Sequence, residues 1–132
     1  MTNSTNKIQT VGRRKTASAR ARLTKGKGII TVEGKPLEEY FAYFELQETV
    51  LAPLKVLSVE KKFDVSIKIS GGGSKSQSEA ARHAIARALV VENEESKPLL
   101  RANGYLTRDA RVKERKKPGK RGARRGQQWK KR

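Results

Sequence analysis

The run Gly71-Gly72-Gly73-Ser74-Lys75-Ser76 is the part of this sequence whose residue types most suggest ligand chemistry. It stands between a predicted strand and a predicted helix, where helix N-terminal amides together with Lys75 can hold a phosphate. A nucleotide-binding P-loop needs a glycine directly before the lysine and another glycine earlier. In this sequence Ser74 stands directly before Lys75, and the glycine that a P-loop needs earlier is also missing. The run therefore predicts either a cradle for an RNA phosphate or glycines that relieve crowding at a tight turn.

Catalysis and metal binding have little support among the side chains. His83 is the only histidine and there is no cysteine; a general base at His83 would need a nucleophile and an orienting partner. We expect His83 to be structural or to contact RNA. Glu92, Glu94 and Glu95 look like the solvated end of a helix, whereas a metal site needs several histidines, cysteines or clustered carboxylates. The sequence predicts no enzyme, no cofactor, no metal and no small-molecule substrate.

The distribution of charge favours a polyanionic partner. Lysine and arginine total 31 against 13 acidic residues, which gives a net charge of +18. Residues 7–27 hold eight basic residues and no acid, and residues 111–132 hold twelve basic residues and one acid, while residues 28–110 are nearly neutral. Cations that neutralise phosphates release condensed counterions, and a net charge of about 2–8 suffices for solubility. No apolar run approaches the ~20 residues that span a bilayer, so we expect no membrane partner.

Many of these cations are candidate contacts to RNA phosphates. Five cluster near the N-terminus without a compensating acid: Arg13, Arg14, Lys15, Arg20 and Arg22. Lys75 lies in the glycine run, and the others lie toward the C-terminus: Arg108, Arg111, Arg115, Lys116, Lys117, Lys120, Arg121, Arg124 and Arg125. Trp129 has only polar neighbours, so it is predicted to stack on a base or a ribose.

The elements that must position these residues follow from hydrophobic periodicity. Residues 16–23 alternate small apolar residues with polar and cationic ones, which predicts a half-buried strand with a cationic outer face. Residues 29–32 and 65–69 read as two further strands. Between them, Pro36 suits the first turn of a helix that carries Leu37, Tyr40, Phe41 and Phe44. Residues 45–51 predict a second short helix that ends near Pro53.

The clearest predicted helix follows the glycine run. Ser76 with Glu79 three residues later forms a capping box, and small residues supply the apolar face: Ala80, Ala81, Ala84, Ile85, Ala88 and Leu89. A helix at residues 97–102 is expected to end at Gly104. The prediction is a small α+β domain over residues 1–110 with helices on a sheet, followed by a basic tail over residues 111–132 without apolar periodicity.

Several segments of the sequence resemble motifs of a known protein family. The segment from Gly71 to Leu89 is similar to the signature of the bacterial-type family of the ninth small-subunit ribosomal protein. The matching positions are Gly71, Gly72, Gly73, Ser76, Gln77, Ala80, Ala84, Ala86, Arg87, Ala88 and Leu89. The segments at residues 12–23 and 106–117 and the terminal Lys131-Arg132 agree as well, in the same order and spacing.

The resemblance implies a fold and a set of partners. The fold would be a four-stranded sheet with helices on one side and a left-handed βαβ crossover, the fourth strand being residues 8–12. The partners would be the 3′ major (head) domain of small-subunit rRNA, neighbouring head proteins, and peptidyl-site tRNA. The tRNA contact would fall on Lys130, Lys131 and Arg132. Lys130 stands where the family commonly has serine, and Pro118 and Gly122 also depart from the usual tail.

Two other classes of function stay open at this level. A histone-like protein that compacts nucleic acid would bind DNA and RNA alike and would not be a stoichiometric part of a ribosomal subunit. A nucleotide-dependent enzyme would bind its nucleotide at the glycine run. The missing P-loop glycine argues against such an enzyme. A cytoplasmic ribosome is the expected location, and a plastid or other organelle ribosome would give a similar sequence.

Overall fold

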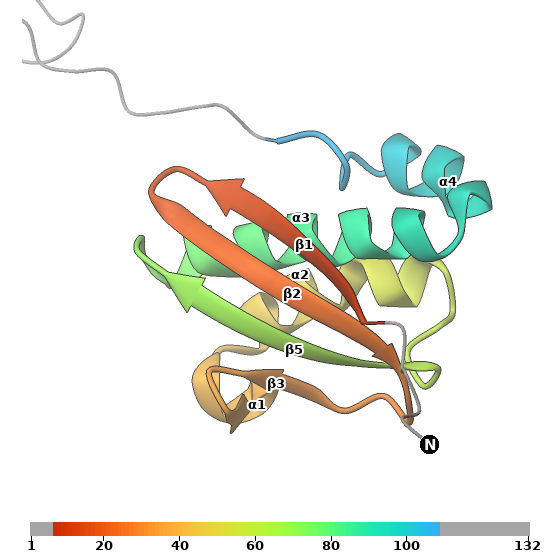
Figure 1. Cartoon of the computed structure of the whole chain (residues 1–132). Coiled ribbons are helices and arrows are strands. Elements are labelled where there is room, and N and C mark those ends of the chain that lie inside the picture. The colour runs from red at the N-terminus through yellow and green to blue at the C-terminus, as the bar shows by residue number, and fades with distance from the viewer. Residues whose placement is uncertain (1–6, 109–132) are drawn as a thin grey trace, which may run out of the picture.

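The computed structural model describes residues 7–108 of this chain, which form a mixed α+β fold (Figure 1). Ten elements follow one another along the chain: β1 Ile8–Arg14, β2 Ala17–Lys25, β3 Ile30–Val32, β4 Lys35–Pro36, α1 Leu37–Tyr40, α2 Phe44–Val56, β5 Phe63–Ser70, α3 Ser74–Glu92, the 3-10 turn η1 Glu94–Ser96, and α4 Lys97–Ala102. The predicted α+β fold class is confirmed, and the domain bounds of 1–110 stay a prediction. None of the described helices is both long enough and apolar enough to cross a membrane.

The five strands form one sheet in the order β1-β2-β5-β3-β4. The β1–β2 and β2–β5 pairs are antiparallel, and β3 pairs with β5 in parallel. The expected strand near residues 8–12 is therefore present as β1. The expectation of four strands is wrong by one, because Lys35 and Pro36 pair with the end of β3 and add a short edge strand. The chain crosses from β3 to β5 through α1 and α2, and the left hand of this crossover stays a prediction.

The core lies between the sheet and the helices on one of its faces (Figure 1). Along β2 the buried side chains are Ala17, Ala19, Ala21 and Leu23, as the alternation predicted, and along β5 they are Phe63, Val65, Ile67 and Ile69. The helical apolar face is also confirmed: Ala80, Ala81, Ala84, Ile85, Ala88 and Leu89 are all buried. Small residues on both sides allow α3 to approach the strands closely.

The closest approach is between β1 and α3. A Cβ atom at Gly12 would lie 2.1 Å from the carbonyl oxygen of Ala80 and 2.4 Å from the nitrogen of Ala84, so only glycine fits there. The hydroxyl of Thr10 donates a hydrogen bond of 2.6 Å to the carbonyl oxygen of Ala84. The strand is thus fixed directly on the helix backbone, which sets the position of every side chain that β1 carries.

Several predicted helix boundaries differ from the structure. The capping box is wrong: α3 begins at Ser74 with Gly73 as its N-cap, no side chain caps it, and Ser76 lies within its first turn. The predicted end near Pro53 is also wrong, because the buried proline lies inside α2, which continues to Val56. The first predicted helix is only α1, since Phe44 begins α2.

The end of α4 agrees with the prediction. Gly104 has a φ of +78°, and its amide donates to the carbonyl of Arg101 at 3.0 Å while the amide of Tyr105 donates to Leu100 at 3.1 Å. These two bonds form a Schellman motif, in which glycine takes the left-handed conformation that other residues adopt at a cost. The motif turns the chain back along α3 toward the C-terminal segment.

Candidate nucleic-acid interface

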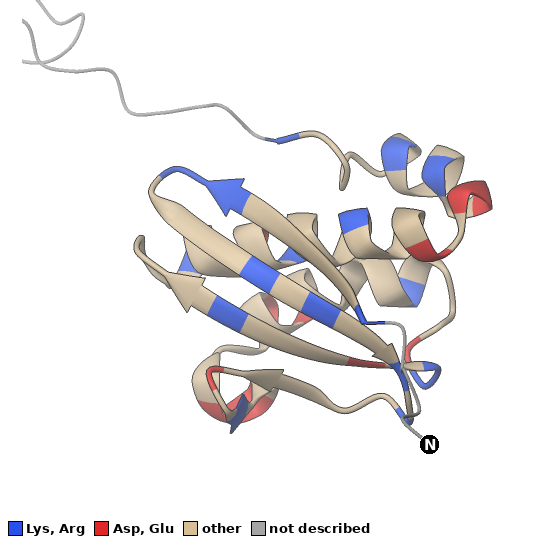
Figure 2. Ribbon diagram, viewed as in Figure 1, with Lys and Arg blue, Asp and Glu red and all other residues tan. Residues whose placement is uncertain are grey.

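The face of the sheet that points away from the helices carries exposed cations, as predicted for β2. Arg20 and Arg22 are exposed there, between buried alanines and Leu23. Register places Arg20 directly opposite Lys68 of β5. Arg13 of β1 is exposed and pairs with Ser18, two residues before Arg20, so it lies on the same face. Figure 2 shows basic residues on β1, β2 and β5. We call this set of Arg13, Arg20, Arg22 and Lys68 the cationic face. Like charges directly opposite on adjacent strands are destabilising in isolation, so their juxtaposition favours a polyanionic ligand.

Lys68 was not among the residues predicted to bind RNA. Its signal was available, because it alternates with Ile67 and Ile69 and so had to lie on the outer face of its strand. The sequence pattern does not show which residue of another strand pairs with Lys68. The antiparallel pairing of β2 with β5 brings Lys68 beside a cation 48 positions earlier in the chain, and no local pattern records that neighbour.

The two acids at the border of the cationic face are occupied by backbone amides. Glu33 accepts a hydrogen bond of 2.6 Å from the amide of Ile69. Asp64 accepts three bonds on one oxygen, from the amides of Lys27, Gly28 and Ile29 at 2.9, 3.0 and 2.9 Å. These bonds, that from Ile29 foremost, lower the pKa of the Asp64 carboxyl. Neither acid forms an ion pair with Arg13, Arg20, Arg22 or Lys68.

Arg14 does not belong to this face, although the sequence grouped it with the phosphate-binding cations. It is only 8% exposed and points toward the helices, in step with Thr10 and Gly12. Its Nε donates to the Glu79 carboxylate of α3 at 2.6 Å, in an ion pair whose side chains are 10% and 20% exposed. The expectation that no acid compensates the N-terminal cations is therefore wrong for this residue, because Glu79 lies 65 positions away in the sequence.

Lys15 and Lys75 are both exposed, and Lys75 is the second residue of α3. Lys15 is in the turn between β1 and β2 with a φ of +54°. The glycine run packs against the same turn: a Cβ at Gly71 would lie 2.5 Å from the carbonyl oxygen of Thr16, and one at Gly72 would lie 2.8 Å from Ala17 Cβ. Crowding thus accounts for two of the three glycines. A phosphate held by Lys75 and the first amides of α3 stays a prediction.

The other edge of β1 meets a second group of cations on α3 and the segment after α4. The Arg87 guanidinium donates to the carbonyl of Val11, and Arg82 lies 5.2 Å from the ring centre of Tyr105. His83 of α3 is half-buried, and burial, followed by the positive charge of Arg87, lowers the pKa of its imidazole. Its Nδ1 is buried and has no hydrogen-bond partner among residues 7–108.

The C-terminal part of the predicted site lies largely outside the described residues. Arg108 is described and is exposed. The remaining predicted rRNA contacts at Arg111, Arg115, Lys116, Lys117, Lys120, Arg121, Arg124 and Arg125 fall in residues 109–132, as do Lys130, Lys131 and Arg132. Within residues 7–108, no group of three or more histidines, cysteines, aspartates or glutamates is arranged to hold a metal ion.

Comparison with known proteins identifies the family. The chain matches the family described as ribosomal protein S9/S16 over residues 12–132. It is 51% identical over 125 residues to the small ribosomal subunit protein uS9 of Porphyromonas gingivalis, which covers 95% of this chain and 98% of that protein. The corresponding protein of Lawsonia intracellularis is 51% identical over 121 residues, covering 92% and 93%, and that of Parabacteroides distasonis is 49% identical over 125 residues, covering 95% and 98%.

These matches confirm the resemblance drawn from the glycine-run signature and from the terminal segments. The relatives carry the names of ribosomal proteins. The chain therefore belongs to the ribosomal protein S9/S16 family.

Proposed function

We propose that this protein is a structural constituent of the small ribosomal subunit, and that it binds the rRNA of that subunit through the cationic face and its two basic ends. The carrying observation is the cationic face itself. Arg20 and Lys68 lie opposite each other on the central strands, without an ion pair to the acids nearby. Pairing within the sheet fixes the backbone from which these side chains extend, so little backbone conformational entropy is lost when phosphates are bound.

The finer assignment is the head of the small subunit, in contact with the 3′ major domain of its rRNA and with neighbouring head proteins. Membership of the family supports it, together with relatives that bear the name small ribosomal subunit protein uS9. A cytoplasmic ribosome is the proposed location. A histone-like role would make no distinction between DNA and RNA, and such a protein would leave purified subunits at high salt, whereas a constituent of the subunit stays with them in one copy.

Replacing Arg20 and Lys68 together by glutamine tests the role of the cationic face. For each phosphate that the variant no longer binds, the dependence of log affinity on log salt should flatten by roughly 0.7–0.9. The matched control replaces Lys97 and Arg101, which are exposed on α4, and so removes the same charge away from the sheet. Filter binding of both proteins to the rRNA head domain across a salt series would decide. Equal slopes for the two variants would mean that only net charge matters, and would refute the assignment of the face.

For the tail, we propose that residues 111–132 bind rRNA and that Lys130, Lys131 and Arg132 reach tRNA in the peptidyl site. A charge-assisted bond to one phosphate contributes about 1.5–3 kcal/mol. Removing residues 130–132 should therefore leave subunit assembly intact, because nine of the twelve tail cations remain, and should weaken tRNA binding several-fold. Filter binding of tRNA to reconstituted subunits measures this. Unchanged tRNA affinity, or failure of the truncated protein to assemble, would refute the assignment.

A further inference from the structure

A second surface of the molecule differs in character from the cationic face. In a chain of net charge +18, residues 33–48 contain five glutamates and one lysine. Within this stretch, Tyr43 is 75% exposed and Phe44 is 72% exposed, where α1 gives way to α2. Two adjacent exposed aromatic side chains are uncommon on a surface that faces only water, and they are typical of interfaces with other molecules.

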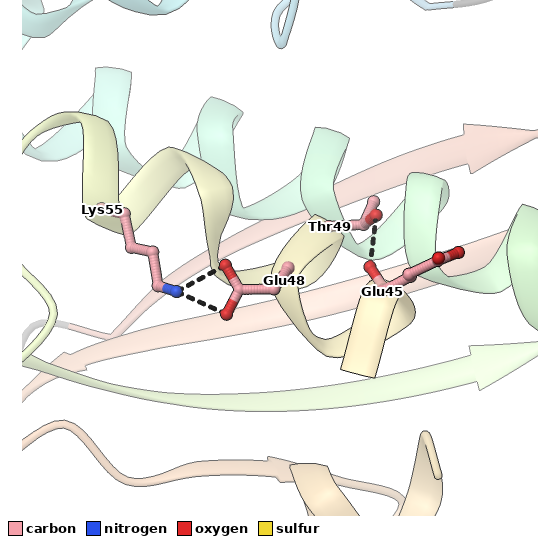
Figure 3. Close-up of polar contacts among 4 residues, drawn as sticks. All are labelled: Glu45, Glu48, Thr49 and Lys55. Carbon is pink, nitrogen blue, oxygen red and sulfur yellow. Dashed lines mark hydrogen bonds and ion pairs between the residues drawn. The ribbon is translucent and has the colours of Figure 1, made fainter. Parts of the chain in front are cut away.

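Three of the carboxylates around this aromatic pair have no cation bound to them within the described part of the chain. Glu48 is bound by Lys55, whose Nζ lies 2.6 Å from both of its oxygens, and Glu45 points away from that pair (Figure 3). The carboxylates of Glu38, Glu39 and Glu45 form no ion pair or hydrogen bond with any residue between 7 and 108, and Glu45 is bonded only through its backbone carbonyl, which accepts from the Thr49 hydroxyl. We call Glu38, Glu39, Tyr43, Phe44 and Glu45 the acidic–aromatic patch.

The backbone beneath the acidic–aromatic patch is held firmly. Phe41 is buried and its ring packs edge-on against Tyr40 at 4.8 Å, while the Tyr40 hydroxyl lies 3.0 Å from the side-chain oxygen of Gln77 on α3. Gln47 donates to the carbonyl of Phe41 at 2.7 Å. These contacts fix the corner between α1 and α2, so the exposed aromatic rings project from an ordered support. Tyr43 is the N-cap of α2 and makes no side-chain capping bond, although serine, threonine or aspartate would cap better.

We propose that the acidic–aromatic patch is a docking surface for a lysine- and arginine-rich segment of another protein. Carboxylates attract such a segment, and tyrosine and phenylalanine faces bind guanidinium and ammonium groups by cation–π contact. RNA is the disfavoured occupant, because three unpaired carboxylates repel phosphates beside the rings on which a base would stack. The molecule then presents two interfaces of opposite sign, the cationic face for RNA and this patch for a basic protein. The inference rests on the proposed function, because the partner is another protein of the small ribosomal subunit.

Site-specific cross-linking in purified small ribosomal subunits tests the proposal. Phe44 is replaced by the photoreactive benzoylphenylalanine, which keeps the exposed aromatic ring. The matched control is the same replacement at Val91, which is 64% exposed and lies beside Glu92 at the end of α3. Mass spectrometry should identify a lysine- and arginine-rich segment of a different ribosomal protein joined at position 44 and not at position 91. A cross-link to RNA, to residues 111–132 of this chain, or to nothing would overturn the proposal.

Charge variants test the electrostatic part in the same subunits. Replacing Glu38, Glu39 and Glu45 by glutamine should lower the yield of the position-44 cross-link several-fold. Replacing Glu92, Glu94 and Glu95 removes the same charge elsewhere and should leave the yield unchanged. An equal effect of both sets, or of neither, would overturn the choice of a cationic partner. Wild-type subunits give an independent check, because carbodiimide should couple the patch carboxylates to lysines of the same partner protein, and absence of that coupling would also overturn the proposal.

Discussion

Alanine at Arg14 and alanine at Arg20 should have opposite effects, although both residues belong to the same cationic run of the sequence. Arg14 is buried against Glu79, whereas Arg20 is exposed on the cationic face. We expect Arg14→Ala to destabilise the fold and to leave the salt dependence of rRNA binding unchanged. Arg20→Ala should leave stability unchanged and flatten that salt dependence.

The magnitudes follow from burial. Removing one partner of a fully buried ion pair costs about 3–5 kcal/mol, because the remaining charge has no partner. The side chains of Arg14 and Glu79 are 10% and 20% exposed, so water partly solvates the charge that remains, and we expect a loss of about 2–3 kcal/mol. An exposed residue such as Arg20 should change stability by less than about 0.5 kcal/mol. When the bond from Arg20 to a phosphate is lost, the slope of log affinity against log salt should change by roughly 0.7–0.9.

Urea unfolding of the full chain, followed by circular dichroism, measures the first effect, and rRNA binding over a salt series measures the second. The double variant Arg14→Ala with Glu79→Ala completes a thermodynamic cycle that isolates the pair. If the two single changes add without coupling, the ion pair does not stabilise the fold. If Arg14→Ala flattens the salt slope while stability is kept, then Arg14 contacts RNA and the structural interpretation is refuted.

Two further predictions concern backbone contacts. Gly12→Ala should lower the free energy of unfolding by about 3 kcal/mol, near the upper end for overpacking, because the new Cβ meets the α3 backbone at 2.1 Å. The control Gly34→Ala lies at a positive φ with open space around it and should cost about 1 kcal/mol. Equal losses for the two variants in urea unfolding would contradict the clash at Gly12. The pKa of Asp64 is lowered by amides 27–29, so its stabilisation is present above the ordinary carboxyl pKa and is lost as the pH falls through the lowered value. The stability difference between wild type and Asp64→Asn should therefore shrink in strong acid, and a pH-independent difference would refute this.

The strands with strict alternation could be predicted from sequence, and β1 could not. In β2 and β5 apolar residues alternate with polar ones, and both strands were predicted, although β5 begins at Phe63, two residues before the predicted start. The inward residues of β1 are Ile8, Thr10, Gly12 and Arg14, a set with one large apolar side chain. Close packing with α3 requires small residues there, so the usual hydrophobic signal is absent. This strand was recognised by resemblance alone, and the ion pair of Arg14 with Glu79 was not anticipated for the same reason.

The helix errors have a similar origin in tertiary contacts. Local rules used Ser76 and Glu79 as a cap, but Glu79 is engaged by Arg14 from a distant strand, and α3 begins two residues earlier. Local rules also ended a helix near Pro53, whereas the proline ring is buried in the core and the helix runs on. In both cases an interaction far along the chain outweighs a local preference. The cationic face itself was predictable on β2, and its partner Lys68 required the sheet order.

The order of strands across the sheet also determines when the cationic face can form during synthesis of the chain. The β1–β2 hairpin can close as soon as residue 25 has been synthesised, since its register is local. Its apolar side has no cover until α3, which ends at Glu92, has been made, and β2 needs β5 beside it. Arg20 and Lys68 therefore come into register only when most of the domain has left the site of synthesis. Recognition of RNA through this face would then select chains whose sheet and α3 have already formed, so that binding itself acts as a check on folding.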